Sequence, residues 1–277
     1  MKNSPIPLTE ILQLHDSWLI LTGAGCSTQA GLGDYRDEKG QWKRPQPITG
    51  QTFRSDELAR KRYWARGFVG WPHFDTAKPT NCHIALARLQ NSLSAPLLIT
   101  QNVDFLHQKA GHKGVVDLHG VLGEVVCLRC NQLTSRSEMQ LRLAKANPWL
   151  NQLDAAYAPD GDADLDDDIT DSVIVPDCLQ CEGMLKPNVV FFGENVPRDK
   201  VNTCFEALDS ASGLLVVGSS MMVYSGFRFC RRAHELGKTI AIVNQGVTRA
   251  DELAQHKIYG ECGALIQEAV AEIELTT

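Results

Sequence analysis

Two pairs of cysteines constrain the fold more than any other feature of this sequence. Cys127 pairs with Cys130 and Cys178 with Cys181, each with the spacing Cys-x-x-Cys, and 47 residues separate the two pairs. A tight turn at each pair places two sulfurs on the same side, so that four thiolates can converge on one zinc ion. Four protein ligands leave no open position for water, which predicts a structural zinc. The alternative is a set of unligated thiols or a redox pair.

The residues between the two pairs predict a small zinc-binding module, residues 126–184. Their number exceeds the usual separation in a zinc ribbon, so a loop must project from the module, and the acidic stretch 160–168 is the natural candidate. Some of its carboxylates alternate as in a calcium loop. The glutamate at the twelfth position and the flanking helices of an EF-hand are missing, so we expect a solvated acidic loop.

The rest of the chain alternates short apolar runs with amphipathic segments. The runs expected to form strands are 18–21, 97–100, 114–116, 214–217 and 239–243. Residues 83–93 and 227–236 are expected helices, and Gly237 is a stop signal for the second. Such alternation predicts an α/β fold, a doubly wound Rossmann-like parallel sheet, with the smaller zinc-binding module inserted.

The expected division of the chain follows from this pattern. Residues 1–125 and 185–277 should form the Rossmann-like domain around the module 126–184. Residues 38–75 are rich in arginine and aromatic side chains with weak periodicity. This composition suggests a long cofactor-covering loop that carries some helix.

A turn with two glycines, Gly23 and Gly25, follows the first expected strand. Glycines there let the backbone approach a pyrophosphate, and the N-terminus of a following helix would supply N–H donors. The third glycine of the usual dinucleotide fingerprint is replaced by Thr28, and Lys43-Arg44-Pro45 stands where an acidic residue is expected. The turn alone fits either a nucleotide site or a plain strand-to-helix turn. The two departures from the dinucleotide fingerprint disfavour a hydride-transferring dehydrogenase.

Composition narrows the class of protein further. A net charge of −6 offers no basic surface for nucleic acid. Residues 1–21 lack the features of a targeting sequence, and no apolar run approaches the length of a membrane span. The five cysteines outside the two pairs show no pairing logic, which fits a reducing compartment. We therefore expect a soluble, cytoplasmic protein with no nucleic-acid or membrane partner.

An ordered set of motifs resembles that of the sirtuins, over nearly the whole chain. Besides the cysteine pairs, these motifs are Gly23 to Arg36, Thr100 to Asp104, Leu118-His119-Gly120, Lys186 to Glu194, Val217 to Ser220 and Ile242 to Asn244. The resemblance implies an NAD-dependent protein lysine deacylase that contains zinc. It would act on acyl-lysine protein substrates and produce nicotinamide, O-acyl-ADP-ribose and free lysine. Residues 62–72 and 223–229 resemble the class II branch, which is associated with lipoamidase and ADP-ribosyltransferase activities.

The resemblance also implies an NAD site built from the turns that follow the strands. The pyrophosphate and the nicotinamide ribose would lie near Gly23, Ala24, Gly25, Asp34, Tyr35 and Arg36. The nicotinamide pocket would consist of Gln101, Asn102, Val103 and Asp104. The adenosine half would contact Gly218, Ser219, Ser220, Asn244, Gln245, Gly246 and Cys262. Asn102 or Asp104 could also cap a helix that begins near Phe105.

His119 would be the catalytic base. In the chemistry of this family the acyl oxygen attacks the anomeric carbon as nicotinamide leaves, and a base then activates a ribose hydroxyl. An imidazole suits this step because it titrates near neutral pH. Without the motif, a lone histidine is more often structural.

Four further residues are implied to contact the substrate. Val190 and Phe192 would contact the acyl-lysine, whose backbone would pair as an added strand near residues 192–194. The alternative for both is core packing. Tyr63 and Arg66 have the Tyr-x-x-Arg spacing that could hold an acidic acyl group. The alternative is a helix face with Tyr63 packed and Arg66 solvated.

Rival functions make different products. A protein ADP-ribosyltransferase or a lipoamidase would use the same NAD site. The transferase would leave protein labelled with ADP-ribose and no free deacylated lysine. A dehydrogenase would generate NADH. A zinc-ribbon module for single-stranded nucleic acid would need a basic, aromatic surface, against which the acidic insertion argues.

Overall fold

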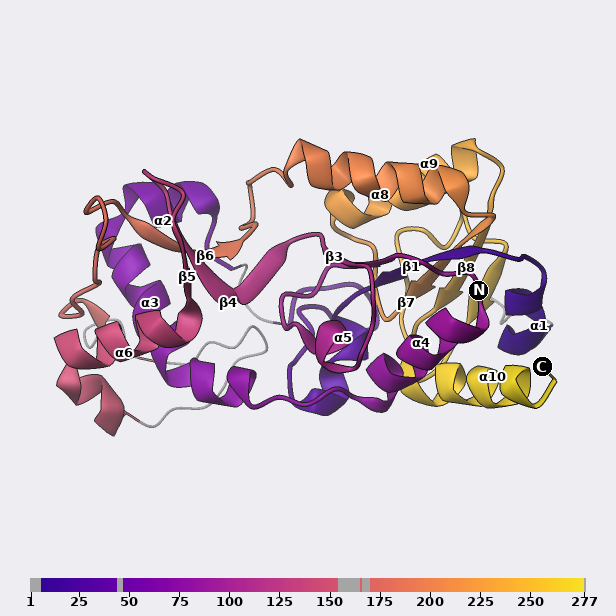
Figure 1. Ribbon diagram of the computed structural model, residues 1–277, viewed down its shortest axis with the longest axis horizontal. Helices are drawn as coiled ribbons and strands as arrows, with labels where there is room; N and C mark the ends of the chain where they lie inside the picture. Colours follow the sequence, from indigo (N-terminus) through magenta and orange to yellow (C-terminus); the bar gives the residue numbers. More distant parts are fainter. Residues whose placement is uncertain (1–5, 44–46, 154–164, 166–169, 277) are drawn as a thin grey trace. The chain divides into compact units, whose positions relative to one another are not determined.

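The computed structural model describes residues 6–43, 47–153, 165 and 170–276 (Figure 1). Its contacts form two compact units. The large unit consists of residues 1–44, 78–118 and 196–277, and the small unit of residues 45–77 and 119–195. The acidic stretch 160–168 lies outside the described residues, apart from Leu165.

The large unit is built on a six-stranded sheet in which every described pair of strands is parallel. In spatial order the strands are β3 (Val115–Asp117), β2 (Leu98–Thr100), β1 (Trp18–Thr22), β7 (Gly213–Val217), β8 (Thr239–Val243) and β9 (His256–Ile258). β1 and β7 are buried along their whole length. Strands covered on both faces need apolar side chains at every position, which is why they read as continuous apolar runs.

Helices cover both faces of this sheet. Figure 1 shows α8 (Arg198–Ser210) and α9 (Tyr224–Glu235) on one face, and α4 (Asn81–Ser92) and α10 (Cys262–Thr276) on the other. The short helices are α1 (Leu8–Gln13), α5 (Leu106–Lys109) and the 3-10 turns η1 (Ala24–Cys26) and η2 (Thr28–Ala30). Leu86 of α4 and Ile266 of α10 are fully buried in one core with Ile20 and Leu215 of the sheet. The predicted doubly wound fold is confirmed.

The predicted elements of this unit are present with small shifts of their ends. The helix expected at 83–93 begins earlier, at Asn81, because Thr80 and His83 form a capping box. Gly237 follows α9 with a φ of +66°, so its role as a stop signal is confirmed. One expectation is wrong: the glycine turn after β1 leads into two 3-10 turns and not directly into an α-helix.

The small unit contains a three-stranded antiparallel sheet in the order β5 (Leu133–Ser135), β4 (Gly120–Cys127), β6 (Leu185–Val189). Its helices are α2 (Gly50–Ser55), α3 (Glu57–Asp75), α6 (Arg136–Ala146) and the 3-10 helix η3 (Pro148–Gln152). Fully buried Phe53 and Trp64 share one core with Val125 and Leu143.

This core explains why the contacts divide the chain differently from the expected boundaries. Residues 45–77 group with the cysteine-containing region, whereas the sequence analysis assigned them to the Rossmann-like domain. The segment 38–75, expected to be a loop with some helix, is helical over most of its length. The aromatic side chains that obscure its periodicity are the ones that fill the core, among them Phe53, Trp64 and Phe68.

Three buried histidines lie together in the large unit. The ring centroid of His107 is 4.6 Å from that of His83 and 5.2 Å from that of His112. Thr80 Oγ1 contacts His83 Nδ1 at 2.8 Å, and Thr22 Oγ1 contacts His107 Nε2 at 2.9 Å. Burial lowers the pKa of His83 and of His112 to about 4, and it also lowers the pKa of His107. The three imidazoles are therefore neutral at pH 7.

We expect this cluster to make the protein sensitive to mild acid. Unfolded histidine titrates near pH 6.5, so between about pH 6.5 and 4 the unfolded chain binds more protons than the folded one. The stability that the buried neutral histidines contribute is thus fully present above pH 6.5 and is lost as the pH falls through this window. In urea unfolding at pH 7.5 and 5, His112→Gln should reduce the pH-dependent loss by about 1 to 2 kcal/mol. His234→Gln, an exposed change on α9, should leave the pH-dependent loss of unfolding free energy unaltered. A His112→Gln protein that loses as much unfolding free energy between pH 7.5 and 5 as the wild type would contradict the prediction.

Candidate functional site

The four paired cysteines meet in the small unit. Cys127 ends β4, Cys130 lies on the following turn, and Cys178 and Cys181 lie on the turn before β6. All four Sγ atoms lie within 4.8 Å of one another. The Sγ atoms of Cys127 and Cys181 are 3.5 Å apart, and those of Cys130 and Cys178 are 3.7 Å apart. Zn–S bonds of about 2.3 Å in a tetrahedron place sulfurs about 3.8 Å apart, so the cluster fits a zinc ion.

Gly183 lets the chain close around this cluster. A Cβ atom at this position would lie 2.8 Å from Cys127 Sγ and 3.1 Å from Cys181 Sγ. Any side chain there would press against the sulfurs. The two turns are held together as well, because Leu128 N donates to Met184 O at 2.9 Å.

In the large unit, the loops proposed for NAD leave the carboxyl ends of neighbouring parallel strands. Gly23, Gln101, Gly218 and Asn244 directly follow β1, β2, β7 and β8. β1 and β7 are neighbours at the point where the strand order reverses, which is where open α/β sheets bind ligands. The structure thus brings these four loops to one edge of the sheet.

Glycines let the loops after β1 and β7 come into contact. Gly25 N donates to Gly218 O at 2.8 Å. A Cβ atom on Gly25 would lie 2.8 Å from Gly218 Cα, and one on Gly23 would lie 2.7 Å from Ser219 Cβ. Glycine at both positions is therefore required for the two loops to pack this closely. A glycine turn at the carboxyl end of a central parallel strand fits the pyrophosphate of a dinucleotide.

The loop after β2 is joined to the loop after β1 by a buried chain of hydrogen bonds. Asn102 Nδ2 donates to Gly23 O at 3.1 Å and to Ser27 Oγ at 3.0 Å. Ser27 Oγ donates to Asp104 Oδ2 at 2.6 Å, and Asp104 Oδ1 accepts from Leu106 N at 2.9 Å. Asp104 thus accepts a hydrogen bond from the first turn of α5, whereas Asn102 makes no such contact among the hydrogen bonds described. Sequence reasoning assigned no role to Ser27, although it lies inside the glycine motif.

Burial raises the pKa of the Asp104 carboxyl, and the hydrogen bonds from Ser27 and Leu106 oppose this rise. The positive charge of Lys109 also opposes the rise of this pKa. Gln101 adds a further link, because its Nε2 donates to Ser219 Oγ at 2.7 Å. The loops after β1, β2 and β7 are therefore joined by direct hydrogen bonds.

Two more segments of the large unit carry predicted NAD residues. Asp34 forms an ion pair with Lys43. Arg36 donates to Gly40 O at 2.7 Å, and its guanidinium lies 4.1 Å from the centre of the Trp42 ring. These contacts order the loop that contains Tyr35. No sequence motif indicated a role for Trp42. Cys262, at the start of α10, is buried with its Sγ 3.5 Å from Val243 O.

In the small unit, His119 lies beside one of the two residues expected to contact acyl-lysine. His119 O accepts from Val190 N at 2.8 Å. Gly120 has a φ of +80°, and a Cβ atom there would lie 2.0 Å from Asn188 O. Glycine after His119 is therefore required for β4 to pair with β6.

Val190 and Phe192 are half-buried, whereas Phe191 between them is buried in the core. Successive side chains of an extended chain point in opposite directions, so packing of Phe191 directs its neighbours away from the core. Phe192 O already accepts from Gly50 N at 2.9 Å. An added peptide strand would have to use other backbone groups near residues 192–194.

A buried ion pair fixes this segment. Lys186 Nζ lies 3.1 Å from Glu194 Oε2, and Glu194 Oε1 lies 2.6 Å from an Arg54 nitrogen. The same Lys186 ammonium donates to the carbonyls of Pro187 and Val189. Glu194 also accepts from Phe191 N at 2.9 Å. Lys186 and Glu194 belong to a recognised motif, but nothing in the sequence alone indicated that they contact each other.

Tyr63 and Arg66, proposed to hold an acidic acyl group, both lie on α3. The Tyr63 ring packs against the rings of Phe53 and Phe191, with centroid distances of 5.5 and 5.3 Å. Arg66 donates to Leu165 O at 3.3 Å. These contacts favour the packing alternative for Tyr63.

Comparison with known proteins assigns the family. Residues 23–225 match the Sir2 family. A protein of Xanthomonas campestris named NAD-dependent protein deacetylase is 52% identical over 255 residues, covering 92% of this chain and 87% of the relative. A protein of Bradyrhizobium diazoefficiens named NAD-dependent protein deacetylase 2 is 51% identical over 269 residues, covering 96% and 98%. A solved structure described as Sir2-p53 peptide-NAD+ superposes with a TM-score of 0.75 at 28% identity, covering 96% and 97%.

The fold, the cysteine cluster and these matches define a zinc-containing, NAD-dependent enzyme of the sirtuin type. The chain belongs to the Sir2 family. It is an NAD-dependent protein deacylase, and its substrates are proteins. Among the described residues, no helix has the length and apolar character needed to cross a membrane.

Proposed function

We propose that this enzyme removes acetyl groups from lysine side chains, with NAD as co-substrate and His119 as the base. The products would be nicotinamide, O-acetyl-ADP-ribose and free lysine. The observation that carries the proposal is the convergence of the loops after β1, β2, β7 and β8 at one edge of the parallel sheet. The preference for acetyl is supported by the names of the relatives and by the packing of Tyr63.

NAD would supply the anomeric carbon that the acyl oxygen attacks as nicotinamide leaves. Gly23 and Gly25 leave their backbone open to the pyrophosphate, and Asn102 and Asp104 form the nicotinamide pocket with Gln101 and Val103. Asn102 and Asp104 are held in place by Ser27, so the pocket is ordered before substrate binds. Arg36 and Asp34 line the ribose, and the loops at residues 218–220 and 244–246 bind the adenosine half.

The small unit would supply the base and the acyl-lysine contacts. Val190 and Phe192 present apolar surface to the acyl-lysine chain. The imidazole of His119 would accept a proton from a ribose hydroxyl, which makes that oxygen nucleophilic. The ion pair of Lys186 and Glu194 keeps Val190 beside His119. The zinc ion would have a structural role only, because four sulfurs complete its coordination.

Acyl preference is tested with a panel of peptides that differ only in the group on one lysine. We expect nicotinamide release and free lysine from the acetyl peptide, with kcat/KM at least about tenfold above that for succinyl and glutaryl peptides. Arg66→Ala and Tyr63→Phe should change acetyl turnover by less than about threefold, since neither removes a contact to an acetyl group.

Three outcomes would contradict this proposal. A preference for succinyl that disappears in Arg66→Ala would assign Arg66 to an acidic acyl group. Transfer of label from NAD to protein, without release of free lysine from any peptide including a lipoyl one, would favour ADP-ribosyl transfer. Release from the lipoyl peptide alone would identify a lipoamidase.

A further inference from the structure

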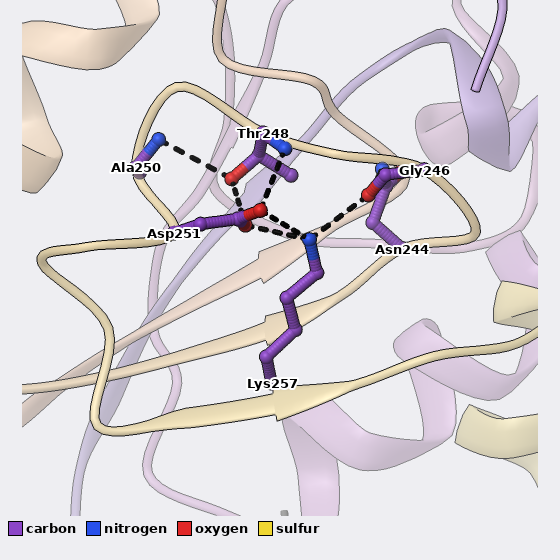
Figure 2. A network of polar contacts seen from close by, with 6 residues as sticks. All are labelled: Asn244, Gly246, Thr248, Ala250, Asp251 and Lys257. Carbon is purple, nitrogen blue, oxygen red and sulfur yellow. Dashed lines mark hydrogen bonds and ion pairs between the residues drawn. The ribbon is translucent and has the colours of Figure 1, made fainter. Parts of the chain in front are cut away.

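A buried ion pair closes the loop between β8 and β9 in the large unit. The side chains of Lys257, on β9, and Asp251 are each 5% exposed. Figure 2 shows the ammonium of Lys257 between the Asp251 carboxylate and the carbonyl of Gly246. Its Nζ donates to Asp251 Oδ1 at 2.6 Å, to Oδ2 at 2.7 Å and to Gly246 O at 2.9 Å. All three protons of the ammonium are used.

Both oxygens of the Asp251 carboxylate also accept hydrogen bonds from Thr248. Thr248 Oγ1 donates to Asp251 Oδ1 at 2.6 Å, and Thr248 N donates to Oδ2 at 3.1 Å (Figure 2). Ala250 N donates to Thr248 Oγ1 at 3.2 Å, which completes the network. The pair therefore has little hydrogen-bonding capacity left for a ligand. Any effect on a ligand must act through the loop.

The loop itself connects the segments to which NAD binding is assigned. Gly246 O accepts from Asn244 Nδ2 at 3.0 Å as well as from Lys257. Val247 N donates to Glu38 O at 2.9 Å, two residues from Arg36. Arg249 N donates to Ser220 O at 2.9 Å. One short loop thus carries one predicted NAD segment, residues 244–246, and contacts two others, near Arg36 and at Ser220.

Space is tight at the centre of this arrangement. A Cβ atom on Gly246 would lie 2.6 Å from Glu38 O. Gly246 Cα therefore packs closely against the backbone of Glu38, and the Gly246 carbonyl accepts from two donors. Loss of the ammonium would leave the Asn244 amide as its only remaining donor among the contacts described.

We propose that Lys257, paired with Asp251, is a positioning residue that sets the affinity for the adenosine half of NAD. It acts by holding the Gly246 carbonyl and, through that carbonyl, the Asn244 side chain. The inference rests on the proposed assignment of Asn244 to Gly246 to the adenosine half. Lys257 has no part in the chemical step, so binding and turnover respond differently to its loss.

The test replaces the whole pair, because removal of one partner would leave a buried charge. In Lys257→Met/Asp251→Leu two apolar side chains take the place of the pair, an exchange that buried ion pairs often tolerate. We expect KM for NAD and Kd for ADP-ribose to rise at least about tenfold, with kcat and the peptide KM within about threefold of wild type. Thr248→Val keeps the ion pair but removes one donor, and a rise of about two- to fivefold is expected.

The matched control is Arg232→Met/Asp209→Leu, which removes an ion pair of 3.0 Å from the surface of the same unit. It should leave KM for NAD unchanged. A folded Lys257/Asp251 variant with unaltered Kd for ADP-ribose would overturn the proposal. So would failure of both that variant and Thr248→Val to fold, because the network would then serve the fold itself. The ADP-ribose titration needs no turnover, so it separates this inference from failure of the proposed deacetylation.

Discussion

His119→Ala is expected to abolish deacetylation, with a loss of roughly 10²- to 10⁴-fold in kcat/KM. The alanine variant cannot accept the ribose proton, and no other group has been assigned that task. The His119 carbonyl still accepts from Val190 N, and Gly120 still permits pairing of β4 with β6, so the fold should persist. Nicotinamide release and lysine formation from an acetyl peptide measure the loss.

His234→Ala provides the matched control, because it removes an exposed imidazole from α9. It should retain full activity. Kd for ADP-ribose should be unchanged in both variants, since the adenosine contacts are assigned to the large unit. A His119→Ala enzyme that retains more than about a tenth of wild-type kcat/KM would show that another group, or water, supplies the base.

Loss of the zinc ion is expected to unfold the small unit. The four cysteines tie the end of β4 to the turn before β6, and without metal their thiolates would repel one another. Cys178→Ser should lower the zinc content well below one ion per chain and the melting temperature by about 10 °C or more. Deacetylation should be lost with it, because His119 and Val190 belong to that unit.

The control for this effect is Cys204→Ala, which removes a buried thiol of the large unit. It should keep one zinc ion per chain, even if packing loss lowers its melting temperature modestly. A Cys178→Ser protein that holds stoichiometric zinc and melts like the wild type would contradict a four-sulfur site.

The strands and the zinc cluster were predictable because both leave local signals. Parallel strands buried on both faces require apolar runs such as Leu214 to Val217, and these are visible without knowledge of the fold. The Cys-x-x-Cys spacing defines its own turn, so the convergence of four sulfurs needed only the two pairs. The motif set around His119 identified the family, which the comparisons confirm.

The grouping of the chain into two units was decided by contacts between distant segments. Phe53 and Trp64 are buried with Val125 and Leu143, from which at least 60 residues separate them. No periodicity within residues 38–75 could reveal this, because the partners of an aromatic side chain are not encoded near it. Only packing showed that residues 45–77 share a core with the cysteine-containing region.

By itself, the sequence determined the fold class, the zinc cluster and the family, since each depends on patterns within short segments. The tertiary structure alone decided which polar groups hold the site together: Ser27 with Asp104, Lys186 with Glu194, and Lys257 with Asp251. A buried charged or polar group must find its partner in space. That partner is fixed by where the strands and loops bring it, which the local pattern of the chain does not record.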